Sequence, residues 1–194
     1  MPSIASHFVV AKKVGELLNI DSNDYYVGSI LPDVIDDPNS HLKIRGTHYL
    51  IPDIDRFIKE STLEQDMFIG YLVHLLLDKY FLEKYVIDNV LDYDKFNLFS
   101  EDKIYEDYTR LNGVLLTEYA IEPDFVQNTL DSITKPLNAA KFQKNKRCAG
   151  ILHTDKAPIY INTATYKAFI DEVSVKIANQ VNDIIISRSL FETK

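Results

Sequence analysis

The chain has 194 residues, of which 46% are hydrophobic, and a formal net charge of -8 from 21 basic and 29 acidic side chains. This length suffices for one domain with a sizeable core, and the negative charge argues against non-specific nucleic-acid binding, which needs a basic surface. The only cysteine, Cys148, excludes an intramolecular disulfide. Because no apolar run approaches the ~20 residues of a transmembrane segment and no signal-peptide core precedes the first helix, we expect a cytoplasmic protein.

The first third of the chain predicts helices separated by polar breaks. Residues 7–20 carry apolar side chains at helical spacing, with Ser6 as the expected N-cap. A second apolar segment covers residues 25–31 and ends at Pro32. Residues 36–46 are typical of a loop, because they contain proline, asparagine and glycine.

A longer helix is predicted around residues 68–81, and it should be central because it is apolar nearly all round. Ser61 or Thr62 followed by glutamate or glutamine resembles a capping box at its start. Between the loop and this helix, Pro52 could open a short helix of its own.

The second half of the chain predicts three more helices, over residues 104–119, 123–133 and 163–186. Residues 136–158 are the least regular stretch, and their basic run at 141–147 is typical of a solvated surface or, alternatively, of a site that attracts phosphate. Evidence for strands is thin, with one short extended piece expected at 159–162. We therefore predict an all-α fold, a single domain over residues 1–194 with roughly six to eight helices.

The most informative pattern is the pair His74 and Asp78, which stand four residues apart in this apolar helix. Positions i and i+4 share one helix face, so the imidazole and the carboxylate should point the same way. A polar pair that faces a dry helix bundle is costly unless something satisfies it. A divalent metal would do so, because imidazole nitrogen and carboxylate oxygen are both good zinc ligands.

Further potential ligands lie upstream in the sequence. Four of the five histidines fall within the first 74 residues, and the acids Asp33, Asp36 and Asp37 lie near them. Histidine and carboxylate ligands together suit borderline cations. Each of these residues taken alone is more typical of an ordinary surface or core-edge position, so spacing leaves the choice open.

The order of four short elements resembles the zinc-dependent phospholipase C family, an all-helical group that includes relatives of the single-strand-specific zinc nucleases. Small bacterial members carry an N-terminal histidine, a Gly-x-x-x-Pro-Asp element, a Thr-His or Ser-His element and a Gly-Tyr-x-x-His-x-x-x-Asp helix. Here these elements are His7, Gly28 to Asp33, Thr47-His48 and Gly70 to Asp78. The resemblance covers residues 3–85, and no family motif follows.

The resemblance implies a role for each matching residue. Asp33, His48, His74 and Asp78 would surround one zinc ion, or another divalent transition metal. His7 would bind a second ion that Asp78 bridges. Asp33, if only weakly bound to metal, would also be the catalytic base that takes a proton from water.

The chain departs from the family pattern after Asp78. Family enzymes have a further histidine shortly after the helix aspartate. They also have a later His-x-x-x-Glu pair, which binds a third metal. Here no histidine follows until His153, which lacks the glutamate, and Glu83 or Asp155 would have to substitute. We therefore expect one or two metal ions, with His41 and His153 as possible additional ligands and His41 interpreted first as a solvated loop residue.

The resemblance predicts a metal-dependent phosphoester hydrolase, in which a metal-activated water attacks a phosphate ester. The alternative is a non-catalytic binding or structural protein that keeps the fold with one metal or none, which the missing third-metal ligands favour. A small phosphoester is the expected substrate, because an acidic chain is poorly suited to an anionic bilayer or a polynucleotide. Oligomeric state and pathway are not readable from the sequence.

Overall fold

The computed structural model describes residues 2–35, 37–47, 49–86, 101–133, 157–159 and 161–192. These residues are mostly helical and include one small two-stranded sheet, which confirms the predicted all-α class. The helices are α1 (Ile4–Leu18), α2 (Asn23–Val34), α3 (Ile54–Glu60), α4 (Gln65–Tyr80), the π-helical turn η1 (Phe81–Tyr85), α7 (Glu101–Glu118), α8 (Pro123–Ile133) and α10 (Thr163–Glu192).

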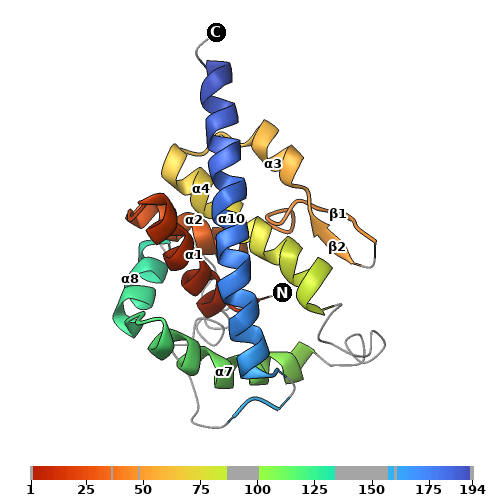
Figure 1. The fold of residues 1–194 in the computed structure, drawn as a ribbon, viewed down its shortest axis with the longest axis vertical. Helices are drawn as coiled ribbons and strands as arrows, with labels where there is room; N and C mark the ends of the chain where they lie inside the picture. Colours follow the sequence, from red (N-terminus) through yellow and green to blue (C-terminus); the bar gives the residue numbers. More distant parts are fainter. Residues whose placement is uncertain are drawn as a thin grey trace.

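Helix α10 runs along the molecule beside α1, α7 lies at the opposite end from the C-terminus, and α8 lies above α7 on the left of the view (Figure 1). Helix α4 packs against α2, α1 and α10, as expected for a central helix. Its residues from Phe68 to Asp78 are all buried. The apolar side chains of this helix therefore form the middle of the hydrophobic core.

Two glycines let α2 and α4 approach each other closely. A Cβ atom at Gly70 of α4 would lie 2.0 Å from the backbone oxygen of Tyr25, and one at Gly28 of α2 would lie 2.3 Å from the backbone oxygen of Met67. Neither position can hold a side chain without separation of the helices. This close contact sets the distance between Ser29 of α2 and His74 of α4, on which the site described below depends.

Two predicted helix starts, those of α1 and α4, differ from the structure, because the expected capping side chains do not cap these helices. Helix α1 is capped by Ser3 instead of Ser6, since the Ser3 hydroxyl accepts a hydrogen bond from the Ser6 N–H. The predicted capping box at Ser61 or Thr62 is wrong: α4 begins after Glu64, and the Ser61 hydroxyl accepts from the Leu63 N–H in the preceding turn.

The predicted loop at residues 36–46 is wrong in its last part. Strand β1 (Lys43–Arg45) pairs antiparallel with β2 (Leu50–Pro52), with Ile44 opposite Ile51. Pro52 therefore ends a strand, and Asp53 caps α3 instead. Alternation is too weak over three exposed residues to predict such a strand.

Other helix boundaries differ from the prediction as well. Helix α2 continues through Pro32 and Asp33 instead of ending before them. Helix α10 extends to Glu192, six residues beyond the predicted end. The basic run at 141–147 and Cys148 lie outside the described residues.

Candidate metal site

Five ionisable side chains from four segments meet beside the centre of α4. His7 comes from α1, Asp33 from the last turn of α2, His41 from the turn before β1, and His74 and Asp78 from α4. The side chains of His74 and Asp78 are fully buried and that of His7 is 1% exposed, whereas His41 is 15% and Asp33 22% exposed. The cluster therefore faces solvent through Asp33 and His41.

The three Nε2 atoms point at the two carboxylates. The Asp78 carboxylate lies 3.5 Å from Nε2 of His7, 3.5 Å from that of His74 and 3.6 Å from that of His41. Asp33 lies 3.2 Å from Nε2 of His41 and 3.9 Å from that of His7. The Nε2 atoms of His41 and His74 are 3.3 Å apart.

His74 is held with a defined proton position. Its Nδ1 lies 2.8 Å from the backbone oxygen of Ser29, and a carbonyl oxygen only accepts hydrogen bonds, so Nδ1 carries the proton. In the neutral ring, Nε2 is then a free lone pair that faces the carboxylates. Metal-binding histidines commonly donate their other nitrogen in this way.

His7 packs flat against His74, with ring centroids 3.7 Å apart and an angle of 8° between the rings. Among the described residues, neither nitrogen of His7 and neither oxygen of Asp78 has a hydrogen-bond partner. A buried carboxylate without a donor is costly, so native structures rarely contain one unless a cation or water completes it.

The electrostatics of the cluster depend on burial and on the mutual attraction of its members. Burial is the main influence on His7 and lowers the pKa of its imidazole. Burial acts to raise the pKa of Asp78, but the neighbouring His74 and His7 outweigh it and keep that pKa well below its ordinary value. Burial also opposes protonation of His74, yet Asp78 and Asp33 raise its pKa. A metal cation would therefore have to compete with a proton for Nε2 of His74.

The donor set fits a metal ion. Ligands of one tetrahedral zinc lie about 3.3–3.6 Å apart, since zinc–nitrogen and zinc–oxygen distances are about 2.0–2.2 Å. Most of the separations within the cluster fall close to that range. Two overlapping groups have the right spacing, His7 with His74 and Asp78, and Asp33 with His41 and His74.

The structure brings together four of the five predicted ligands: His7, Asp33, His74 and Asp78. The interpretation of His41 as a solvated loop residue is wrong, because its ring turns inward and contacts both Asp33 and His74. The signal available in the sequence was proximity, since His41 lies eight residues after Asp33. The predicted ligand His48 and the additional candidate His153 lie outside the described residues.

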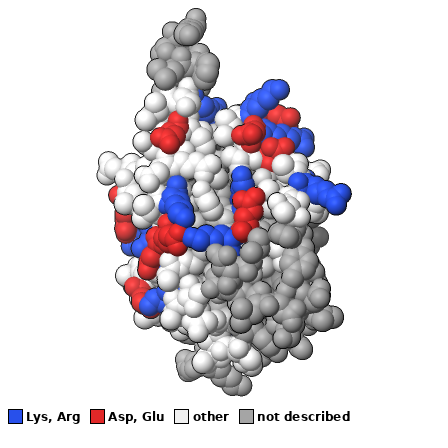
Figure 2. Space-filling view, turned by 45° about the vertical axis from the view of Figure 1, so that its right-hand side comes forward, with Lys and Arg blue, Asp and Glu red and all other residues white. Residues whose placement is uncertain are grey.

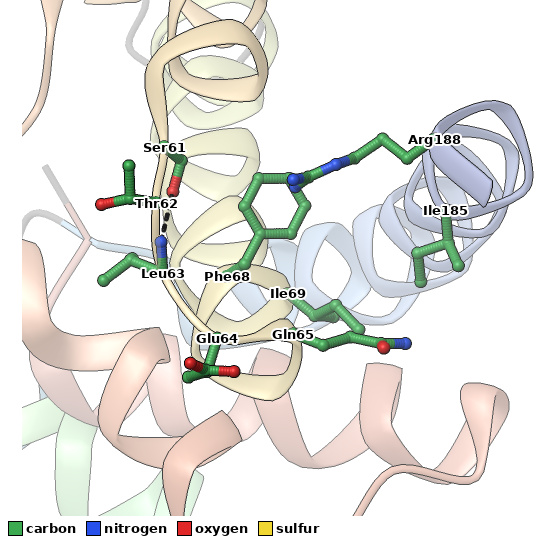
Figure 3. Close-up of a pocket in the computed structure, with 9 residues that line it drawn as sticks. All are labelled: Ser61, Thr62, Leu63, Glu64, Gln65, Phe68, Ile69, Ile185 and Arg188. Carbon is green, nitrogen blue, oxygen red and sulfur yellow. Dashed lines mark hydrogen bonds between the residues drawn. The ribbon is translucent and has the colours of Figure 1, made fainter. Parts of the chain in front are cut away.

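A cavity of about 390 Å³ lies apart from the cluster, between the start of α4 and the last turns of α10. Figure 3 shows the Arg188 guanidinium over the ring of Phe68, with the Ser61 hydroxyl accepting from the Leu63 N–H. None of the five cluster residues lines this cavity.

No family model, curated protein or solved structure matches the chain. In the described part of the chain, no helix combines the length and the apolar character needed to cross a bilayer. Figure 2 shows basic and acidic side chains interspersed over one face, without a continuous basic area among the residues drawn in colour.

Proposed function

We propose that the protein is a metal-dependent phosphoester hydrolase of the zinc-dependent phospholipase C type, with zinc as the bound ion. The observation that carries the proposal is the Asp78 carboxylate, fully buried among three imidazole nitrogens and without a hydrogen-bond donor among the described residues. Three of the four sequence elements that resemble the family supply four of the five residues in this cluster.

The geometry favours one ion at these residues. Both metal-competent groups contain His74, and its Nδ1 is already used by the Ser29 carbonyl. Only Nε2 remains, and one nitrogen lone pair binds one metal. We infer that a single ion binds here. Its ligands come from some or all of four side chains, those of His7, His41, His74 and Asp78, and Asp33 lies on its solvent-exposed side.

A divalent metal ion supplies a nucleophile at neutral pH by lowering the pKa of its coordinated water to about 7, and it polarises a phosphoryl oxygen. The side chains of the cluster then divide into two roles. The buried residues would fix the position of the metal ion and its charge. Asp33, at 22% exposure and on the solvent side, accepts a proton from the attacking water through a carboxylate oxygen.

The substrate we propose is a small soluble phosphoester. The chain carries a net charge of -8, so long-range electrostatics do not concentrate polynucleotides or anionic membranes around it. A small ester needs only local compensation of its charge at the site.

Metal content and turnover test the proposal together. Protein purified without added metal should contain close to one equivalent of zinc, manganese or iron, and should cleave bis-p-nitrophenyl phosphate or p-nitrophenyl phosphate. His41→Ala, a change outside any helix, should lose metal and activity, whereas Asp33→Asn should retain metal and lose activity. Asp131→Asn, an exposed site on α8, is the matched control and should change neither.

A non-catalytic metal-binding protein is the second candidate. It is favoured by the burial of His7, His74 and Asp78, which leaves only two partly exposed residues to face a substrate. The missing third-metal ligands favour it too. One equivalent of tightly bound metal without turnover of either nitrophenyl ester would support this candidate over the hydrolase.

A further inference from the structure

His41 differs from the other members of the cluster in its backbone. His7, Asp33, His74 and Asp78 all lie on helices, whereas His41 lies in the turn that precedes β1. A helix fixes the direction of its side chains, and a turn does so much less. Something other than secondary structure must therefore direct the His41 ring into the cluster.

The hydroxyl of Ser40 contacts the outer nitrogen of that ring. Ser40 is buried, and its Oγ lies 3.0 Å from Nδ1 of His41 and 2.8 Å from the backbone oxygen of Pro32. A hydroxyl has one hydrogen, and the carbonyl can only accept it. Ser40 therefore donates to Pro32 and accepts from the Nδ1–H of His41. This directs Nε2 of the ring toward Asp33, at 3.2 Å, and toward Nε2 of His74, at 3.3 Å, and leaves Nε2 as the nitrogen that would bind a metal.

The turn itself is tied to α4 by Tyr71. The Tyr71 hydroxyl donates a hydrogen bond to the backbone oxygen of Ser40. Burial raises the pKa of Tyr71 to about 12, so the hydroxyl keeps its proton at neutral pH. Tyr71 lies three residues before His74, so one helix carries two cluster residues and also holds the turn that carries a third.

Aromatic stacking restrains the Tyr71 ring. Phe57 of α3 stacks on Tyr71 with centroids 4.8 Å apart and on Phe68 with centroids 5.1 Å apart. The Arg188 guanidinium lies 4.1 Å from the Phe68 centroid. The position of the Tyr71 hydroxyl is therefore set by packing between α3, α4 and α10.

We propose that Ser40 and Tyr71 are positioning residues for the metal site, with Tyr71 fixing the turn and Ser40 fixing the orientation and tautomer of His41. This inference rests on the proposed metal-binding function. Hydrogen-bond partners behind a metal-binding histidine typically change metal affinity by about 10–100-fold when they are removed. We expect a loss of that size for Ser40 and a smaller loss for Tyr71, which acts through the backbone.

Zinc affinity measured by chelator competition, with the visible spectrum of the cobalt-substituted protein as second readout, tests this arrangement. Ser40→Ala should weaken zinc binding about 10–100-fold and alter the cobalt spectrum, and Ser40→Thr, which keeps a hydroxyl, should recover most of both. Tyr71→Phe should weaken binding less. Ser174→Ala removes another buried hydroxyl, which donates to a helix carbonyl on α10, and should leave both readouts unchanged.

A measurement on metal-free protein separates this inference from the proposed function. Long-range proton–nitrogen NMR spectra should show a proton on Nδ1 of His41 in the wild type and a lower occupancy of that position in Ser40→Ala. Wild-type protein without a proton on Nδ1 of His41, or a Ser40→Ala variant with wild-type zinc affinity and cobalt spectrum, would overturn the positioning role. The expected Nδ1 proton in a protein that takes up no metal would support the positioning of His41 and count against the proposed function.

Discussion

Asp78 and Asp107 are both fully buried aspartates on helices, yet their surroundings are opposite. Asp107 of α7 accepts hydrogen bonds from the N–H groups of Ile159 and Ile161, at 2.8 and 2.9 Å, and from Arg110 at 3.1 Å. Asp78 has no donor of this kind among the described residues and faces three imidazoles instead. Burial alone therefore does not tell whether a carboxylate is satisfied by hydrogen-bond donors, whereas the nature of its neighbours does.

The largest effect on stability should come from loss of Asp107, the carboxylate whose hydrogen bonds are satisfied. Asp107→Ala removes an ion-pair partner of Arg110 and the acceptor of the Ile159 and Ile161 N–H groups. Removal of one partner from a buried ion pair costs about 3–5 kcal/mol. Urea unfolding should show a destabilisation of this size, equal with and without zinc, and a dependence on zinc would show that Asp107 also contributes to the metal site.

Removal of the metal should produce the next largest effect. A ligand that binds only the folded state at 100 times its dissociation constant stabilises by about 2.7 kcal/mol. Wild-type protein in excess zinc should therefore unfold at a higher temperature or urea concentration than in chelator. The Asp107→Ala variant should show the same difference, and an absence of any zinc effect on wild-type protein would contradict the metal site.

Asp78→Asn should have a smaller effect than Asp107→Ala in chelator and a large one in zinc. In chelator the substitution removes the attraction of His74 and His7 for the carboxylate, which lowers stability. The loss should be smaller than that of Asp107→Ala, because no hydrogen-bond donor among the described residues is left without its acceptor. In zinc, the stabilisation seen for wild type should be absent, and a loss of stability in chelator as large as that of Asp107→Ala would end the contrast between the two aspartates.

The smallest effect is expected at an exposed carboxylate. Hydrogen bonds from Lys176 and Lys84 lower the pKa of Glu172 to about 2. Because this pKa is below that of the unfolded chain, the contribution to stability is present above pH ~4.5 and is lost as the pH falls toward 2. Glu172→Gln should therefore lower the urea midpoint slightly at neutral pH.

The size of that difference depends on pH and salt. It should shrink as the pH approaches ~2, and at neutral pH it should shrink in 1 M salt, since exposed charges are screened. A shift at neutral pH that persists in high salt would mean that Glu172 has a packing role.

The helices were the part of the fold that local pattern could predict. Helix α8 begins and ends where its pattern indicated, and α7 and α10 differ only at their ends. Caps were less predictable, because Ser3 and Ser6 are equivalent in sequence and the choice depends on where the helix begins to pack. The hairpin before α3 was missed, since three-residue strands carry too little alternation.

The residues of the candidate site were easier to predict where their contacts join positions close together in the sequence. His74 and Asp78 share a helix face by spacing alone, and the resemblance of ordered motifs added Asp33 and His7. His41 was misassigned because its ring is directed by Ser40 and Tyr71, and Tyr71 lies 31 residues from the Ser40 carbonyl it bonds. No local pattern reports a contact of that separation.

The sequence by itself determined an all-α chain with a polar pair on an apolar helix, because helical periodicity and i, i+4 spacing are local properties of the backbone. Only the tertiary structure decided which imidazoles meet that pair and which buried carboxylate has no hydrogen-bond donor in the part of the chain that the structure describes. Those outcomes depend on the close approach of α2 and α4 at Gly28 and Gly70, and on hydrogen bonds between segments distant in the chain. Packing, which acts across the whole molecule, fixes them.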